Sequence, residues 1–164
     1  MKTLLLIRHA HSDWGGLQHA DHTRPLSKTG KDEALDTGLF IKKQSWQIDG
    51  LIHSDARRTT ETALIIHTAI QRPATALVAE PSLYQSSPET IESIVMGFSD
   101  SWNAAGVVCH NPGISDFLRI LFPGNQVQSF SPACVAAIAI DTYHWLDFTN
   151  APKRLLFFYR PLVH

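Results

Sequence analysis

The sequence has very little cysteine, and the two thiols it contains, Cys109 and Cys134, do not form a framework of paired positions. Two cysteines are too few for the disulfide scaffold of a small secreted protein. Both lie among apolar neighbours, where a thiol behaves as a small hydrophobic group. We therefore expect buried free thiols in a reducing compartment, and a cytoplasmic protein.

The sequence also lacks an excess of charge and a long hydrophobic run. It has 14 Lys and Arg against 15 Asp and Glu, for a formal net charge of -1. Proteins that bind nucleic acid or anionic membranes need a surplus of basic residues to neutralise phosphates, so neither partner is expected. The first apolar run, Leu4 to Ile7, ends at Arg8 and is too short for a signal-peptide core or a membrane span.

Repeats and low-complexity tracts are absent as well, and the nine prolines and nine glycines are scattered between apolar segments. A chain of 164 residues with 44% hydrophobic and 18% charged residues can bury one substantial core. That length is short for two independent domains. We predict a single domain over residues 1–164.

The apolar segments alternate between short runs typical of buried strands and longer stretches with helical spacing. Strands are predicted at Lys2–Ile7, Gly50–His53, Ala76–Val78, Ala105–Cys109, Cys134–Asp141 and Arg154–Tyr159. Helices are predicted at Lys28–Lys43 after a Ser27 cap, Arg57–Ile70, Pro88 to about Gly97 after a Ser87 cap, and Gly113–Leu121. This alternation predicts an α/β fold, a three-layer α/β/α sandwich with a mostly parallel central sheet, whose last two strands pair at its far side.

Polar residues follow three of these strands at their carboxyl ends. The segments read Arg8-His9-Ala10, His53-Ser54-Asp55 and His110-Asn111-Pro112-Gly113. In a parallel sheet these ends border one crevice, where ligands bind. Arginine holds phosphoryl oxygens with a permanently charged fork, and neutral imidazole is a competent nucleophile toward phosphorus. Arg8, one arginine of the Arg57-Arg58 pair and His9 are therefore candidates for phosphoryl chemistry.

The run Leu5-Leu6-Ile7-Arg8-His9-Ala10 resembles the signature of the histidine phosphatase superfamily, also called phosphoglycerate-mutase-like. Alanine at position 10 replaces the usual glycine, a form associated with the short SixA-type phosphohistidine phosphatases. The resemblance continues through four later segments, namely Asp21–Ser27, Gly30–Ala34, Ser54–Ala63 and Val107–Gly113. It implies the phosphoglycerate-mutase-like fold and a hydrolase that needs neither a metal nor an organic cofactor.

The resemblance also assigns roles to individual residues. It implies that His9 becomes phosphorylated and that Arg8, Arg58 and His110 surround the phosphoryl group. The family spacing, matched here by Ser54, Arg58 and Thr62, selects Arg58 rather than its neighbour. Further contacts with the substrate are expected from Arg24, Ser54 and Asn111.

The substrate is suggested by a feature that is missing. Mutases and acid phosphatases of this group protonate an alcohol leaving group with a carboxylic acid, and Glu80 to Glu89 contain no convincing acid motif. Imidazole leaves more readily than an alkoxide, so a phosphohistidine on a phosphorelay protein is the expected substrate. The chain is also short for a helical lid. A small-molecule phosphomonoesterase of the same superfamily is the alternative, and either pocket would accept a phosphate ion.

Alternatives from other classes are a metal-dependent hydrolase and a non-catalytic phosphate-binding module. The possible metal ligands are His9, His11, His19, His22, Asp13 and Asp21, although they lack the short helical spacing of strong metal motifs. A cysteine phosphatase is disfavoured because Ser115 and Ile140 stand where its arginine is required. His53 and His67 are expected to be structural, and Trp14 is the tryptophan nearest the proposed nucleophile.

Overall fold

A six-stranded mixed sheet forms the centre of the computed structural model, which describes residues 1–15, 20–72, 74–124 and 129–162. The strands are β1 (Lys2–Arg8), β2 (Gly50–His53), β3 (Ala76–Ala79), β4 (Ala104–Cys109), β5 (Val135–Ile140) and β6 (Lys153–Tyr159). Their order is β3-β2-β4-β1-β5-β6. The first four strands pair in parallel, whereas β5 is antiparallel to both β1 and β6.

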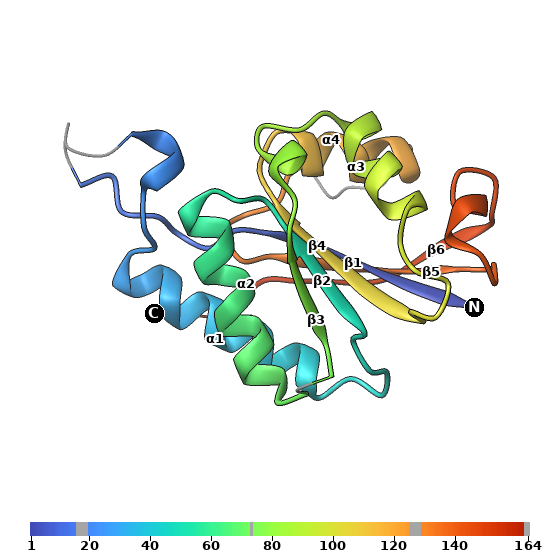
Figure 1. Cartoon of the computed structure of the whole chain (residues 1–164), viewed down its shortest axis with the longest axis horizontal. Helices are drawn as coiled ribbons and strands as arrows, with labels where there is room; N and C mark the ends of the chain where they lie inside the picture. Colours follow the sequence, from blue (N-terminus) through green and yellow to red (C-terminus); the bar gives the residue numbers. More distant parts are fainter. Residues whose placement is uncertain (16–19, 73, 125–128, 163–164) are drawn as a thin grey trace.

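Helices cover both faces of this sheet (Figure 1). Helices α1 (Lys28–Lys42) and α2 (Arg57–Ile70) lie on one face, and α3 (Pro88–Met96) and α4 (Gly113–Leu121) on the other. Short 3-10 helices at Asp21–Thr23, Pro81–Leu83 and Trp145–Asp147 occupy connecting segments. The prediction of a three-layer α/β/α sandwich with a terminal strand pair is confirmed. None of the helices described is long and apolar enough to cross a membrane.

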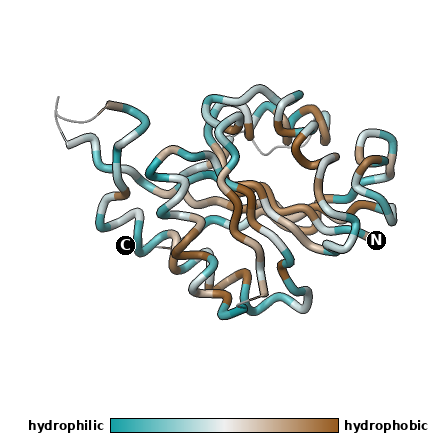
Figure 2. Tube along the Cα trace, viewed as in Figure 1, coloured by the Kyte–Doolittle hydropathy of each residue, from teal (hydrophilic) through white to brown (hydrophobic). Residues whose placement is uncertain are grey.

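Strand β1 is the hydrophobic centre of the molecule, because its side chains alternate between two cores. Leu4 and Leu6 pack in the core beneath α3 and α4, while Leu5 and Ile7 pack in the core beneath α1 and α2. All four are fully buried, and burying each contributes about 1.5–3 kcal/mol. Figure 2 shows hydrophobic residues concentrated along the central strands. This explains an apolar run without the alternation of a half-exposed strand.

The helix starts follow the predicted caps. Ser27 Oγ accepts a hydrogen bond from the Gly30 amide at 3.0 Å, and Ser87 Oγ accepts one from the Thr90 amide at 3.3 Å. Gly30 also brings α1 against the loop after β1, since a Cβ there would lie 1.9 Å from the His11 carbonyl oxygen. The start of α1 therefore fixes the backbone immediately beyond His9.

The carboxyl ends of β1, β2 and β4 meet at one edge of the sheet. The His9 amide donates to the Cys109 carbonyl at 3.1 Å, and the Ser54 amide donates to the Val108 carbonyl at 3.0 Å. These bonds continue the ladder one residue past each strand. The polar segments that follow the three strands are thereby held side by side, as their positions in the sequence predict.

Candidate active site

A pocket of about 570 Å³ opens at this edge of the sheet. Six of the seven site residues expected from the sequence line it, and Ser54 is the exception. The lining residues are Arg8, His9, His11, Ser12, Trp14, Asp21, Arg24, Arg58, Gln85, His110, Asn111 and Pro132.

His9 lies deep in the pocket with one ring nitrogen tied to the backbone. Its Nδ1 lies 2.7 Å from the Ala10 carbonyl oxygen, which can only accept, so Nδ1 carries the proton. Its Nε2 consequently bears the lone pair and accepts weakly from Arg58 Nε at 3.4 Å. Burial lowers the pKa of His9 to about 3, and the positive charges nearby act in the same direction. The ring is therefore neutral near pH 7 with its unprotonated nitrogen facing the arginine.

Arg58 joins three groups of the pocket through its guanidinium fork. While Nε faces His9, Nη2 lies 3.2 Å from His110 Nδ1 and 3.0 Å from Asp21 Oδ2. Nη1 donates to the Asp21 carbonyl oxygen at 2.6 Å. The residue is only 4% exposed. The edge formed by Nε and Nη2 thus spans the two histidines, where a phosphoryl group would be held.

Helix α2 fixes both the arginine and the loop after His9. Thr62 Oγ1 donates to the Arg58 carbonyl at 2.7 Å and accepts from the Ala10 amide at 3.1 Å. The neighbouring Arg57 points elsewhere, because its Nε donates to Glu61 at 2.7 Å on the helix surface. The spacing noted in the sequence therefore has a structural basis, since Thr62 links the helix to the loop that follows His9.

His110 faces His9 across the pocket, and Ser54 hydrogen-bonds to the side of the His110 ring that faces away from the pocket. The two imidazole centroids are 5.2 Å apart. His110 Nε2 lies 2.8 Å from Ser54 Oγ, and Ser54 is fully buried. Burial, followed by the charge of Arg58, lowers the pKa of His110 to about 4. Ser54 therefore holds the ring and does not face the pocket, in contrast to the substrate contact expected for it.

Arg8 and Asn111 share one backbone acceptor. Arg8 Nη1 and Asn111 Nδ2 donate to the Phe130 carbonyl oxygen at 2.8 and 3.0 Å. Ser115 Oγ accepts from the Phe130 amide at 3.0 Å and donates to Asn111 Oδ1 at 2.6 Å. Arg8 Nε is buried without a partner among the described residues, and burial lowers the pKa of Arg8. The segment before β5 thus orients two pocket residues, which sequence reasoning did not anticipate.

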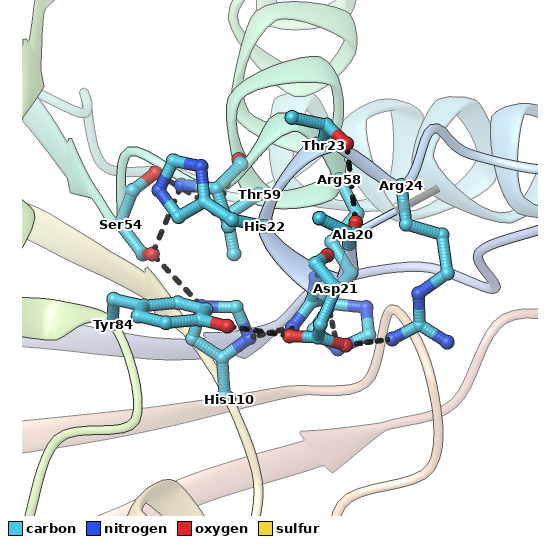
Figure 3. A network of polar contacts seen from close by, with 12 residues as sticks. Ala20, Asp21, His22, Thr23, Arg24, Ser54, Arg58, Thr59, Tyr84 and His110 are labelled. Atoms are coloured by element: carbon cyan, nitrogen blue, oxygen red, sulfur yellow. Dashed lines mark hydrogen bonds and ion pairs between the residues drawn. The ribbon is translucent and has the colours of Figure 1, made fainter. Parts of the chain in front are cut away.

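Asp21 lies at the mouth of the pocket between two arginines and a tyrosine (Figure 3). Its Oδ1 accepts from Arg24 Nη2 at 2.9 Å, and its Oδ2 accepts from the Tyr84 hydroxyl at 2.7 Å as well as from Arg58. The Tyr84 hydrogen bond is the main cause that lowers the Asp21 pKa, and the two arginines add to it. The carboxylate is therefore ionised near neutral pH.

Arg24, predicted to contact the substrate, is stacked between the pocket and an exposed indole. Its guanidinium carbon lies 3.8 Å from the centroid of the Trp14 ring, and Trp14 is 77% exposed. Arg24 itself is 7% exposed, and its Nε and Nη1 have no partner among the described residues. A buried cation with free donors beside a pocket is suited to binding an anion.

Two residues of this network were missed as site residues. Asp21 was considered only as a metal ligand, although its position three residues before Arg24 permits the i,i+3 pair observed here. Tyr84 lies between Glu80 and Glu89, in the segment whose carboxylates form no acid motif. No local pattern around it signals that its hydroxyl reaches Asp21, 63 residues away.

The histidines of the alternative metal cluster are dispersed. His11 Nδ1 lies 2.5 Å from Glu33, and His22 Nε2 lies 3.0 Å from Asp55. No group of three or more His, Cys, Asp or Glu that could hold a metal ion occurs among residues the structure describes. His19 falls outside those residues. The loop imidazoles are thus engaged by separate carboxylates.

The remaining candidates are held in the interior. Cys109 and Cys134 are buried, and desolvation raises the pKa of both thiols, that of Cys109 to about 12. Such thiols are protonated and poor nucleophiles. His53 and His67 each place a ring nitrogen on a backbone carbonyl, at 2.8 and 3.0 Å, which fits the structural role expected of them.

The site agrees with two sequence comparisons. The family model for the histidine phosphatase superfamily (branch 1) matches residues 4–83, a range that includes Arg8, His9 and Arg58. A chloroplastic protein of Arabidopsis thaliana with uncharacterised function is 32% identical over 129 residues, 73% of this chain. The chain spans 59% of the length of that relative. The chain belongs to the histidine phosphatase superfamily. Membership supports a phosphatase function.

Solved structures with the same architecture include SixA proteins. A protein from Nakamurella multipartitia, proposed to be the phosphohistidine phosphatase SixA, superposes with a TM-score of 0.86 at 22% identity, over 99% of this chain and 97% of that one. A protein histidine phosphatase SixA complexed with tungstate gives 0.79 at 18% identity, over 97% of each chain. These matches show that this histidine phosphatase has the phosphoglycerate-mutase-like fold of the SixA structures.

Proposed function

We propose that this histidine phosphatase hydrolyses protein phosphohistidine through a phosphorylated His9, as a SixA-type enzyme. The observation that carries the proposal is the state of His9. Its Nδ1 donates to the Ala10 carbonyl at 2.7 Å, and its unprotonated Nε2 faces Arg58 in an open pocket, where it accepts only a weak hydrogen bond. A neutral imidazole fixed in this way needs no proton removed before it attacks phosphorus.

In the first step, the lone pair of His9 Nε2 attacks phosphorus. A bond forms between Nε2 and phosphorus while the bond between phosphorus and the leaving group breaks and its electron pair departs with that group. Arg8 and Arg58 stabilise the non-bridging oxygens, where charge is concentrated in the transition state. The positive charge that develops on the His9 ring is shared with Nδ1–H, which donates to the Ala10 carbonyl.

His110 completes the pocket by changing which nitrogen carries its proton. In the structure Arg58 Nη2 donates to Nδ1, so the proton is on Nε2 and faces Ser54 Oγ. When a phosphoryl oxygen binds beside Nδ1, the ring releases the Nε2 proton to solvent and takes one up at Nδ1, so that Nδ1–H donates to that oxygen and the Ser54 hydroxyl donates to Nε2. A hydroxyl can serve either tautomer because it is both donor and acceptor.

In the second step, water attacks the phosphorylated His9 from the side that the leaving group vacated. An oxygen–phosphorus bond forms, the bond to Nε2 breaks and neutral His9 is restored, with inorganic phosphate as product. This cycle uses side chains only. Activity that survives incubation with a chelator is therefore expected, and its loss would favour the metal-dependent alternative.

A protein substrate is supported by the accessibility of the pocket mouth. The Trp14 side chain is 77% exposed and that of Asp21 is 44% exposed, so a histidine on another protein's surface can approach. The expected partner is a phosphohistidine-bearing domain of a phosphorelay. The SixA fold likeness supports the same substrate over an alkyl phosphate, as does the lack of a neutral carboxylic acid among the described residues that line the pocket.

The test is to incubate the protein with a radiolabelled phosphohistidine protein, quench it and map the label. We expect acid-labile, base-stable label on His9, and none on a His9→Ala variant that retains wild-type circular dichroism. A His67→Ala variant is a matched control outside the pocket and should be labelled normally. Turnover that persists in His9→Ala would refute the covalent mechanism, and a strong preference for phosphomonoesters would favour the small-molecule alternative.

A further inference from the structure

The position of Asp21 relative to His9 places a carboxylate on the leaving-group side of the pocket. His9 is 8% exposed and lies at the base, whereas the Asp21 side chain is 44% exposed at the mouth. One guanidinium separates them, since Arg58 Nε faces His9 and Nη2 contacts Asp21 Oδ2 at 3.0 Å. A phosphoryl group attacked by His9 Nε2 directs its leaving group away from His9, toward the mouth.

Asp21 has capacity for one more hydrogen bond. A carboxylate offers about four lone-pair sites, and three of them are engaged by Arg24, Arg58 and Tyr84. The three donors approach from the protein and fix the direction of the carboxylate (Figure 3). The remaining acceptor position belongs to a side chain that is 44% exposed to solvent.

The charge of this carboxylate limits what it can do. The hydrogen bond from Tyr84, together with the charges of Arg58 and Arg24, lowers the Asp21 pKa, so it holds no proton to give to a departing alkoxide near pH 7. An ionised carboxylate can only accept. The leaving group that suits this position is one that presents a donor.

A phosphoimidazole has the required donor. When its distal ring nitrogen carries a proton, cleavage of the phosphorus–nitrogen bond sends the electron pair to the proximal nitrogen and releases a neutral imidazole. No proton is needed at the cleaved bond. An acceptor for the distal N–H stabilises the cationic ring and thereby favours the form of the substrate whose leaving group departs readily.

We infer that Asp21 selects an imidazole leaving group by accepting a hydrogen bond from the distal N–H of the substrate ring, an assignment that rests on the proposed function. Arg24, Arg58 and Tyr84 hold the carboxylate in place. The site thus distinguishes phosphohistidine from a phosphomonoester through an acceptor at its mouth.

The experiment compares three small phosphodonors with the wild-type protein and Asp21→Asn. The donors are phosphoimidazole, its freshly prepared N-methyl derivative, which is cationic but has no distal N–H, and p-nitrophenyl phosphate. We expect Asp21→Asn to lower kcat/KM for phosphoimidazole by about tenfold or more, the loss typical of one charge-assisted hydrogen bond. Any loss that arises from Arg58 should be the same for all three donors, so the loss for phosphoimidazole should exceed the losses for the other two by about tenfold.

Controls separate this inference from a structural role and from failure of the proposed function. Asp32→Asn, an exposed position on α1 outside the pocket, is the matched control. Equal losses for all three donors would show that Asp21 only positions Arg58 and would overturn the inference. Should the asparagine variant fail to fold, Asp21→Ser is subjected to the same comparison. A wild-type protein that uses none of the donors and acquires no label at His9 would instead refute the proposed function.

Discussion

Ser54 Oγ and His110 Nε2 lie 2.8 Å apart on the side of the imidazole that faces the interior. Ser54 is fully buried and also accepts from the Ala56 amide at 3.3 Å, so its position is fixed by the turn that precedes α2. Because a hydroxyl both donates and accepts, Ser54 can hydrogen-bond to His110 Nε2 in either tautomer of the imidazole. Its contribution to catalysis should therefore exceed its contribution to folding.

Replacement of Ser54 by alanine tests this relationship. We expect kcat/KM to fall about 10- to 100-fold, because a buried ring nitrogen loses its partner, and the free energy of unfolding to fall by about 1–2 kcal/mol. Steady-state kinetics and urea unfolding measure the two effects. Ser93→Ala, at an exposed position on α3, is the control. An unchanged kcat/KM would remove Ser54 from the function of His110.

The two pocket histidines predict how stability depends on pH. The pKa of His9 is lowered to about 3 and that of His110 to about 4 from an ordinary 6.5, both mainly by burial. Between those values and 6.5 the unfolded chain binds more protons, so stability falls as pH decreases through that interval and is unaffected above it. Each ring contributes a slope of up to about 1.4 kcal/mol per pH unit.

Urea unfolding at a series of pH values between 4 and 8 measures this slope. A His9→Gln variant should show a shallower fall below pH 6, because one of the two depressed groups is gone. Activity should follow the neutral form of His9 and therefore persist at pH 5. A wild-type stability that is constant from pH 8 to 4.5 would contradict the burial of neutral rings.

Arg24 predicts an effect on anion binding. Its Nε and Nη1 are buried without partners among the described residues, and its guanidinium stacks on Trp14. Arg24→Lys keeps the charge but loses the planar stack and the fork, so we expect tungstate or phosphate to inhibit about tenfold more weakly. Competitive inhibition constants test this, with Arg72→Lys, which lies outside the pocket, as control. Unaltered inhibition would place Arg24 outside the anion site.

Gly30 predicts a local effect on stability. A Cβ at this position would lie 1.9 Å from the His11 carbonyl oxygen, which belongs to backbone and cannot rotate away. Gly30→Ala should therefore lower the free energy of unfolding by about 2–4 kcal/mol. A Cβ at Gly124 would have no neighbour within 4 Å, so Gly124→Ala tests instead the cost of a positive φ of 86°. A smaller loss for Gly30→Ala than for Gly124→Ala would contradict the close packing of α1 on the loop.

The fold and the residues at the base of the site could be predicted from the sequence, because local sequence patterns specify them. Strand β1 is a continuous apolar run, and the caps at Ser27 and Ser87 precede the helices that they start. His9 and His110 each follow a parallel strand, so topology alone brings them to the same edge. Such patterns depend on the order of the elements along the chain and on hydrophobic periodicity, and both can be read from the sequence.

The contacts at the mouth of the site could not be predicted from local sequence patterns. The Tyr84 hydroxyl reaches Asp21 across 63 positions of the sequence, and no periodicity links the two. Ser54 was assigned to the substrate because sequence places it beside the site but does not tell which way its side chain points. The carbonyl of Phe130 was overlooked because every residue has one, so composition cannot single it out.

That carbonyl has a consequence for how the protein can vary. Because a main-chain oxygen holds Arg8 and Asn111, both hydrogen bonds depend on the path of the chain at residue 130, and the fully buried Phe130 side chain anchors that path in the core. Inserting or deleting one residue between Phe130 and β5 would displace the oxygen by up to about 3.5 Å, farther than either donor can follow without losing its bond. The geometry of the pocket is thus set by the course of the main chain at this point, and it is intolerant of a change in chain length.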